Sequence, residues 1–297
     1  PGGYPPIINA GDVSNKGLEL EINYQSDQKR EFKYNVSANL ASIKNRVLKV
    51  PEGVDFIPGA SFGVGGNVAT RFEEGFAIGY FHGYETNGVF QNQEQIDNSP
   101  VYQEGAQPGD LIFVDQNQDG IISFNDNNDK TNIGSPIPKL NLGFALSLNY
   151  KGFDLSTNLY AAIGQQIIRN FERQQPYANQ LSYVWNRWTG ENTSNEHPRV
   201  TTGATRNTVF SDYYVEDGSF LRFRNIQLGY TLPKKLTQKF KTESVRFYVS
   251  ANNLFTLTNY QGYDPDIGAT AGTLSAGVDY GFYPQAKTIM GGLMIKF

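Results

Sequence analysis

The sequence predicts an all-β fold, a transmembrane antiparallel β-barrel. Three observations carry this prediction: the composition, a repeated alternation of apolar and polar residues, and a regular succession of short and long connections. The 297 residues include 18 Tyr, 20 Phe and 31 Gly, whereas charged residues make up only 18%. Aromatic residues favour strands and glycine favours turns, so this composition argues against long helices.

Charge and residue content exclude several classes of function. The formal net charge is −4, so no basic excess recommends a nucleic acid as partner. The sequence has no cysteine, which excludes disulfides, a thiolate zinc site and a cysteine nucleophile. No apolar run approaches the roughly 20 residues of a transmembrane helix, but a barrel strand exposes only alternate residues to lipid and escapes that test.

Apolar and polar residues alternate in seven stretches. Because successive side chains of a strand point to opposite faces, this pattern indicates strands with one apolar face. The apolar series are Leu18 to Tyr24, Phe32 to Leu40, Leu142 to Tyr150, Phe153 to Leu159, Ile226 to Leu232, Val245 to Ala251, and Ile289 to Phe297. Several stretches span about 10 residues, the length of a tilted strand that crosses a bilayer. A change of parity between Phe223 and Ile226 predicts a β-bulge.

Short and long connections follow one another strictly along the chain. The predicted short ones are Ser26 to Arg30, Lys151-Gly152, and Pro233 to Glu243, and the predicted long ones are 41–139, 164–219 and 257–286. Outer-membrane barrels have short periplasmic turns and long extracellular loops, whereas a soluble sandwich has no reason to sort its loops by side. We therefore expect a chain in the bacterial outer membrane, in contact with lipid, with its three long connections outside the cell.

Seven strands are too few to close a barrel. An open edge in lipid would leave backbone groups without hydrogen-bond partners, which is costly. We therefore expect residues 1–297 to be one part of a longer barrel, with further strands before Pro1. The opening segment Pro1-Gly2-Gly3-Tyr4-Pro5-Pro6 has neither an initiator Met nor the features of a signal peptide, which agrees with this expectation.

Several local patterns occur in a definite order along nearly the whole chain. They are Asn9-Ala10-Gly11 to Leu20, Glu74-Gly75 to Tyr84, Gly88-Val89-Phe90-Gln91, Gly109-Asp110 to Asp119-Gly120, Asn186-Arg187-Trp188-Thr189 to Pro198-Arg199, Phe220-Leu221-Arg222 to Pro233, Asn252 to Phe255, and Gly262-Tyr263-Asp264-Pro265. In this order and spacing they resemble the C-terminal part of the TonB-linked outer-membrane transporters of the SusC/RagA type.

The resemblance implies a barrel of about 22 strands, with an N-terminal plug that is energised through the TonB complex. It also implies a SusD-like surface lipoprotein as partner. The plug and the TonB-contacting segment of this family have no counterpart in residues 1–297. The implied function is the active import of a large nutrient, with an oligosaccharide favoured over a peptide because of the family's habit.

Two other functions stay open at this point. One is a calcium-stabilised, secreted, carbohydrate-binding β-sandwich, and the other is an outer-membrane barrel hydrolase. The hydrolase has little support, because His82 and His197 lie neither in a metal-ligand spacing nor beside a nucleophile elbow. We therefore expect that the chain is not an enzyme.

The segment from Asp115 to Asp126 matches the spacing of an EF-hand calcium loop. The oxygen ligands would be the side chains of Asp115, Asn117, Asp119 and Asp126 and the carbonyl of Ile121, with Gly120 at the sharp turn. Asp126 stands where the usual ligand is Glu. The alternative is a polar turn held by Asx hydrogen bonds. A calcium ion here would be structural and would brace an exposed loop.

The long connections also carry many aromatic residues. These either stack on sugar rings or peptide side chains, or form small local cores and interfacial girdles. The residues concerned are Tyr183, Trp185, Trp188, Tyr213, Tyr214, Tyr260, Tyr263 and Tyr283. The sequence does not decide between these roles for any one of them.

Overall fold

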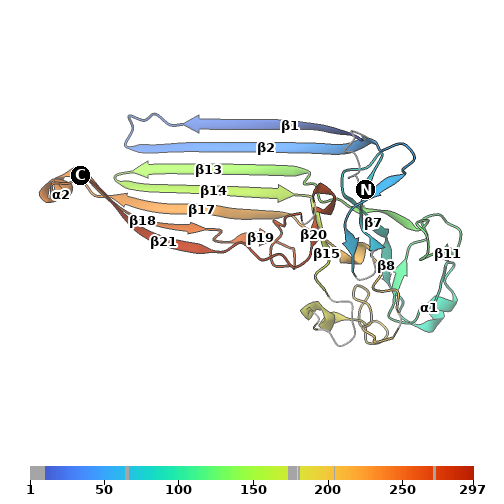
Figure 1. Cartoon of the computed structure of the whole chain (residues 1–297). Helices are drawn as coiled ribbons and strands as arrows, with labels where there is room; N and C mark the ends of the chain where they lie inside the picture. The colour runs from blue at the N-terminus through green and yellow to red at the C-terminus, as the bar shows by residue number, and fades with distance from the viewer. Residues whose placement is uncertain (1–10, 64–66, 173–178, 180, 204, 270–271) are drawn as a thin grey trace, which may run out of the picture.

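One antiparallel sheet dominates the computed structural model, which describes residues 11–63, 67–172, 179, 181–203, 205–269 and 272–297. Within these residues the sheet has eight strands in the order β1-β2-β13-β14-β17-β18-β21, with β19 paired to β17. Their bounds are β1 (Asp12–Gln25), β2 (Phe32–Lys49), β13 (Leu140–Tyr150), β14 (Phe153–Ile163), β17 (Phe220–Thr231), β18 (Ser244–Asn252), β19 (Thr256–Thr258) and β21 (Thr288–Lys296). All seven predicted strands are therefore present, and β1 and β21 form the edges of the described sheet (Figure 1).

Apolar side chains of neighbouring strands lie in rows on one face of this sheet. Residues directly opposite each other in an antiparallel pair point to the same face. One such row runs through Tyr34, Leu148, Leu155, Leu228 and Val249. Leu228 and Val249 are 53% and 57% exposed and none of the five is buried, so no second sheet of the described residues packs on this row. The secreted β-sandwich, which needs a second sheet packed on the apolar face, is therefore not the fold.

The connections are sorted between the two ends of the sheet, as predicted. The short turns and the short helices α2 (Lys234–Thr237) and η3 (Gln238–Phe240) lie at one end. The three long connections lie together at the opposite end (Figure 1). None of the described helices is long and apolar enough to cross a membrane.

The first long connection is shorter than the sequence pattern predicts. Strand β2 continues to Lys49, so the connection begins at residue 50 rather than at residue 41. Polar residues such as Lys44 and Asn45 interrupt the alternation, which hides the strand from a pattern search. They nevertheless pair with Lys16 and Asn15 of β1, because backbone hydrogen bonds extend this hairpin beyond its apolar stretch. In the third long connection, β18 already ends at Asn252 and β19 lies within the connection.

The predicted β-bulge in β17 is confirmed. Asn158 of β14 faces Asn225, whereas the next residue, Leu159, faces Phe223, so Arg224 is the extra residue. A bulge of this kind changes which side chains face each way along the strand. It also marks the point at which β17 changes its partner from β18 to β19.

The long connections contain short elements of their own. The first holds β3 (Phe56–Pro58), β4 (Ser61–Phe62), β5 (Asn67–Val68), β6 (Thr70–Glu73), β7 (Tyr80–Tyr84), β8 (Thr86–Val89), α1 (Gln93–Asp97), β9 (Tyr102–Gln103), β10 (Leu111–Phe113), β11 (Ile121–Ile122) and β12 (Lys130–Gly134). The second holds β15 (Gln166–Arg169), η1 (Ser182–Asn186), η2 (Asp212–Tyr214) and β16 (Val215–Asp217), and the third also holds η4 (Thr273–Ser275) and β20 (Val278–Asp279). Strands β16, β15 and β20 form one small sheet, which joins the second connection to the third.

Two hydrophobic clusters lie in the long connections. The first contains Phe81 of the first connection, Ile168 and Phe210 of the second, and Val278 of the third. The second is built from Tyr84, Val89, Leu111, Phe113 and Ile122. The loops thus bury their own apolar residues against one another, and they form a packed body rather than three independent flaps.

Candidate functional site

A buried ion pair holds the first and second long connections together. The carboxylate of Asp110, which is 2% exposed, accepts hydrogen bonds from Arg199 Nε at 2.6 Å and Nη2 at 3.2 Å, and from Asn207 Nδ2 at 3.0 Å. Beside it, Gly109 has a φ of 89°, and any side chain there would collide with Trp188 and Arg199. The segments Gly109-Asp110 and Pro198-Arg199, which the resemblance singled out separately, are therefore contact partners.

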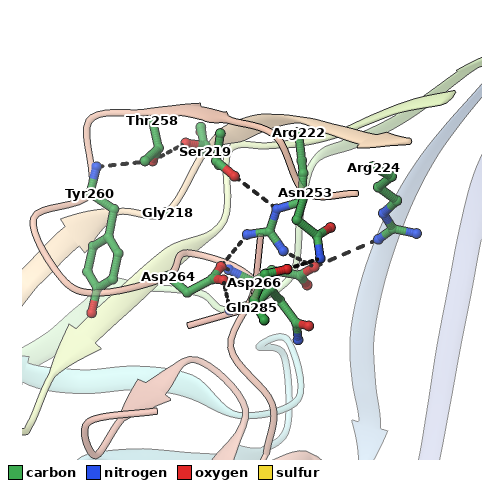
Figure 2. A network of polar contacts seen from close by, with 12 residues as sticks. Gly218, Ser219, Arg222, Arg224, Asn253, Thr258, Tyr260, Asp264, Asp266 and Gln285 are labelled. Atoms are coloured by element: carbon green, nitrogen blue, oxygen red, sulfur yellow. Dashed lines mark hydrogen bonds and ion pairs between the residues drawn. The ribbon is translucent and has the colours of Figure 1, made fainter. Parts of the chain in front are cut away.

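A buried arginine ties the third connection to the main sheet (Figure 2). Arg222 of β17 forms an ion pair with Asp264, donates through Nη1 to Asp266 at 3.2 Å, and donates through Nε to Thr256 Oγ1 at 3.0 Å. The other oxygen of Asp264 accepts from the backbone N–H of Gln285 at 3.0 Å. A guanidinium group suits this site, because its donors form a planar fork that satisfies several acceptors together.

Another buried arginine lies on β15 of the second connection, the strand that pairs with β20 of the third. Arg169 of β15 is 5% exposed and forms ion pairs with Glu172 and with Glu216, the latter at 2.5 Å. Its guanidinium also lies 4.6 Å from the centre of the Tyr183 ring and 5.5 Å from that of Tyr213. Burial raises the pKa of Tyr213 to about 12, so this phenol stays protonated and neutral beside the charged cluster.

Two cavities are lined by residues of the long connections. One has a volume of about 700 Å³ and includes Trp185, Asn186 and Arg187 in its wall. The other has a volume of about 510 Å³ and includes Asn259 and Gln261. Residues 195–197 contribute to the walls of both cavities. Their volumes are in the range of small-molecule binding sites.

The predicted calcium loop forms a tight polar turn. The carboxylate of Asp115 accepts from the backbone N–H groups of Gln118 and Gly120, and Asn117 and Asp119 accept from residues two positions ahead. Asp126 accepts instead from Asn128 N–H at 3.0 Å. In the described part of the chain, no three His, Cys, Asp or Glu side chains are grouped closely enough to hold a metal ion. Calcium binding, with the carbonyl of Ile121 as a further ligand, therefore stays a prediction that requires Asp126 to approach Asp115 and Asp119.

The aromatic candidates fall into two groups. Local packing holds Tyr183, Trp188, Tyr213, Tyr214 and Tyr260; for example, the Tyr260 hydroxyl donates to Asp279 at 2.6 Å. Three others point outward, with Trp185 81%, Tyr263 73% and Tyr283 91% exposed. The exposed group is available to a ligand or partner, and Trp185 also lines a cavity.

The two histidines occupy different surroundings. His82 of β7 is 8% exposed, and its Nε2 lies 3.3 Å from Arg71 Nη1. Burial, with the positive charges of Arg71 and Lys130, lowers the pKa of His82 to about 4, so its imidazole is neutral at pH 7. The ring of His197 instead contacts the Tyr213 hydroxyl at 3.3 Å at the rim of the cavities. The two rings belong to separate environments and do not form one catalytic group.

The sequence does not single out several polar residues in the walls of the cavities. Asn195, Asn259 and Gln261 lie in irregular segments, where neither periodicity nor motif spacing marks them. Arg222 is different, because it is a charged residue flanked by Leu221 and Phe223. A charged residue in an apolar stretch of a strand needs a buried partner, and this signal could have predicted its ion pair.

The chain is similar in sequence to known TonB-dependent receptors. It is 34% identical over 299 residues to TonB-dependent receptor P3 of Formosa agariphila, a match that covers 98% of this chain and 29% of that receptor. It is 28% identical over 291 residues to TonB-dependent receptor SusC of Bacteroides thetaiotaomicron, covering 97% of this chain and 27% of SusC. No family model matches the chain.

Solved structures agree with these relatives. The structure of the RagAB peptide transporter superposes with a TM-score of 0.73 at 23% identity, over 97% of this chain and 29% of that one. The RagAB peptide importer in its closed-closed state gives a TM-score of 0.72 at 24% identity. At these identities the likeness shows the fold, and it confirms the predicted antiparallel β-barrel architecture.

The comparisons also bear on location and on catalysis. All the relatives named above are receptors or transporters, which supports the prediction that the chain is not an enzyme. The same sequence similarity confirms the predicted location in the bacterial outer membrane. The chain is therefore a relative of the TonB-dependent receptors of the SusC/RagA type, and it spans about 29% of the length of the first receptor that it matches.

Proposed function

We propose that the protein imports a large nutrient across the bacterial outer membrane by TonB-dependent active transport. The supporting observation is the match of 98% of the chain to a TonB-dependent receptor at 34% identity. In this proposal the sheet forms part of the barrel wall, with its exposed apolar rows toward lipid. The long connections, on the extracellular side, receive the nutrient before it passes through the barrel.

Two partners complete the transport cycle that we propose. The TonB complex supplies energy through the N-terminal plug that the family resemblance implies, and a SusD-like surface lipoprotein covers the extracellular loops. The packed body formed by the long connections supports this role, because a lipoprotein that covers the loops needs a well-ordered surface to dock on. Its two hydrophobic clusters, together with the ion pairs of Arg169, Arg199 and Arg222, hold this body in one arrangement.

We favour an oligosaccharide over a peptide as the nutrient. The neighbouring solved structures are named as peptide transporters, but at 23% identity their likeness to this chain shows the fold and not the substrate. The cavities favour a sugar, because amide, carboxylate and hydroxyl side chains make up most of their walls and an exposed indole lies in one of them. Such side chains suit the hydroxyl groups and apolar ring faces of sugars.

Uptake in living cells tests the proposal. Cells of the native bacterium that lack this protein, and matched cells that lack TonB, are given fluorescently labelled oligosaccharides or peptides. We expect both strains to lose uptake of the same nutrient class, and the reintroduced gene to restore it. Uptake that persists in either strain at the wild-type rate contradicts TonB-dependent import. Hydrolysis of the labelled nutrient by the purified full-length protein would instead support the barrel hydrolase.

A further inference from the structure

We propose that the two cavities, which share residues 195–197 in their walls, form one binding groove for a neutral oligosaccharide, with these residues at its centre. This inference rests on the proposed import function and names the class of substrate that the loops select. The groove runs from the exposed Trp185 at one end to Asn259 and Gln261 at the other. It brings together the second and third long connections.

The centre of the groove is held in place from both sides. The backbone N–H of Trp188 donates to the carbonyl of His197 at 2.9 Å, which closes the intervening segment into a loop. Asn195 Oδ1 accepts from Val89 N–H at 3.2 Å, and a side chain in place of Gly88 would collide with the Asn195 amide. Because residues 195–197 are fixed before a ligand arrives, binding costs little ordering entropy.

Several polar groups in the groove are unused within the described part of the chain. No described residue bonds to the side-chain amides of Asn186, Asn259 and Gln261. The Glu196 carboxylate is 84% exposed and has only a distant contact, 3.9 Å, with His197. Amides and carboxylates can bond to pairs of adjacent sugar hydroxyls, and the indole of Trp185 offers a flat apolar surface for a sugar ring.

The charges of the groove favour a neutral sugar over an acidic one. The acidic side chains in its walls are Glu196, Asp212, Glu216 and Asp217, and the basic ones are Arg169 and Arg187. Arg169 is already paired with Glu172 and Glu216, so it offers little attraction to a further anion. The same pairing offsets the charge of Glu216, so a uronic acid or a sulfated sugar at the Gln261 end would meet the carboxylates of Asp212 and Asp217 and would be repelled.

The same walls disfavour a peptide. Peptide sites use a free strand edge, apolar side-chain pockets, or an apolar groove for a helix. The apolar side chains in the walls are few, and Leu111 among them is 1% exposed and belongs to a hydrophobic cluster. The groove therefore lacks the apolar anchor sites that a peptide of mixed sequence needs.

Binding to the full-length receptor in detergent tests the inference. The probes are an array of defined neutral and acidic oligosaccharides and a library of short peptides of similar mass. We expect the receptor to bind neutral oligosaccharides. Trp185→Ala should weaken this binding about tenfold, because one stacking contact is lost, and Trp185→Phe should weaken it less. Gln261→Ala should weaken the same ligands. Tyr283→Ala is the matched control, because Tyr283 is 91% exposed on a long connection and lines neither cavity.

Each contrary result points to a different error. Binding of acidic sugars or of peptides, if Trp185→Ala weakens that binding, would overturn the neutral-sugar assignment. Equal binding by the Trp185→Ala, Gln261→Ala and Tyr283→Ala variants, or no oligosaccharide binding by the unchanged receptor, would overturn the groove. Uptake by TonB-competent cells, measured with the same sugars, separates the two proposals. Import that continues in the Trp185→Ala strain at the wild-type rate refutes only the groove. A complete lack of TonB-dependent import for every probe refutes the proposed function.

Discussion

Asp110 and Arg199 lie 89 residues apart in the sequence and meet in two hydrogen bonds, of 2.6 and 3.2 Å, between the first and second long connections. The carboxylate is almost fully buried, so hydrogen bonds from this arginine and from the amide of Asn207 replace the water that would otherwise surround it. The pair lies next to the backbone hydrogen bond from Arg199 N–H to Gly109 O. It therefore joins two connections and also sets the position of the chain that follows residues 195–197.

Removal of the Asp110 carboxylate should loosen the loop body. We expect Asp110→Ala to destabilise it by about 2 kcal/mol, because Arg199, whose side chain is only 18% exposed, and Asn207 both lose their buried acceptor. Hydrogen exchange measured by mass spectrometry on the full-length protein should show faster exchange in residues 109–113. Glu104→Ala is the control, since Glu104 forms an exposed pair with Arg206 at 3.8 Å and its loss should cost less than about 1 kcal/mol. Equal exchange in the two variants would refute a structural role for the buried pair.

Arg222 should not tolerate replacement by lysine. Lys keeps the positive charge but cannot contact Asp264, Asp266 and Thr256 together, as Arg222 does. We expect Arg222→Lys to speed hydrogen exchange of β19 and residues 264–285 by about tenfold, which corresponds to roughly 1.4 kcal/mol. Arg224→Lys is the matched control, because Arg224 is on the same strand, is about half exposed and reaches Asp266 only at 3.8 Å (Figure 2). Slow exchange in both variants would show that the positive charge alone suffices.

The sequence predicts the sheet better than it predicts the loop body, and the reason is physical. The alternation that marks β13 and the parity change at Arg224 are local consequences of which face each side chain takes. The ion pair between Arg222 and Asp264 and the contact between the first and second connections at Asp110 depend instead on how distant segments fold together. No periodicity encodes such contacts.

The candidate site follows the same division. Trp185 was identified from the sequence as one of eight aromatic candidates, but only burial separates it from Tyr214, which packs in the first cluster. Gln261 carries no local signal at all, since a polar residue in a loop is ordinary. Its place in the groove arises because the third connection lies against the second, where Gln261 N–H donates to Glu216 at 3.0 Å.

His82 should make the loop body sensitive to acid. Its pKa falls from 6.5 to about 4 on folding, so between these values the unfolded chain binds a proton that the folded chain does not. Stability is therefore fully present above pH 6.5 and declines as the pH falls toward 4, by about 3 kcal/mol in total. Hydrogen exchange of β7 at several pH values measures this decline. His82→Gln should reduce the slope in this range, and an unchanged slope would show that other groups cause it.

Calcium should protect the turn from Asp115 to Asp126 if the EF-hand-like spacing is functional. We expect an affinity in the range of about 0.1 to 1 mM, because Asp126 is shorter than the usual Glu and must move to reach the ion. Limited proteolysis of the full-length protein, with calcium or with a chelator, should show slower cleavage in this turn when calcium is present. Asp119→Ala should abolish the protection, because it removes an oxygen ligand at the third acidic or amide position of the loop. Asp97→Ala, which removes a carboxylate at the end of the exposed helix α1, should leave the protection unchanged. Equal cleavage with calcium and with chelator in the unchanged protein would show that the Asx hydrogen bonds of Asp115, Asn117 and Asp119 hold this turn without a metal ion.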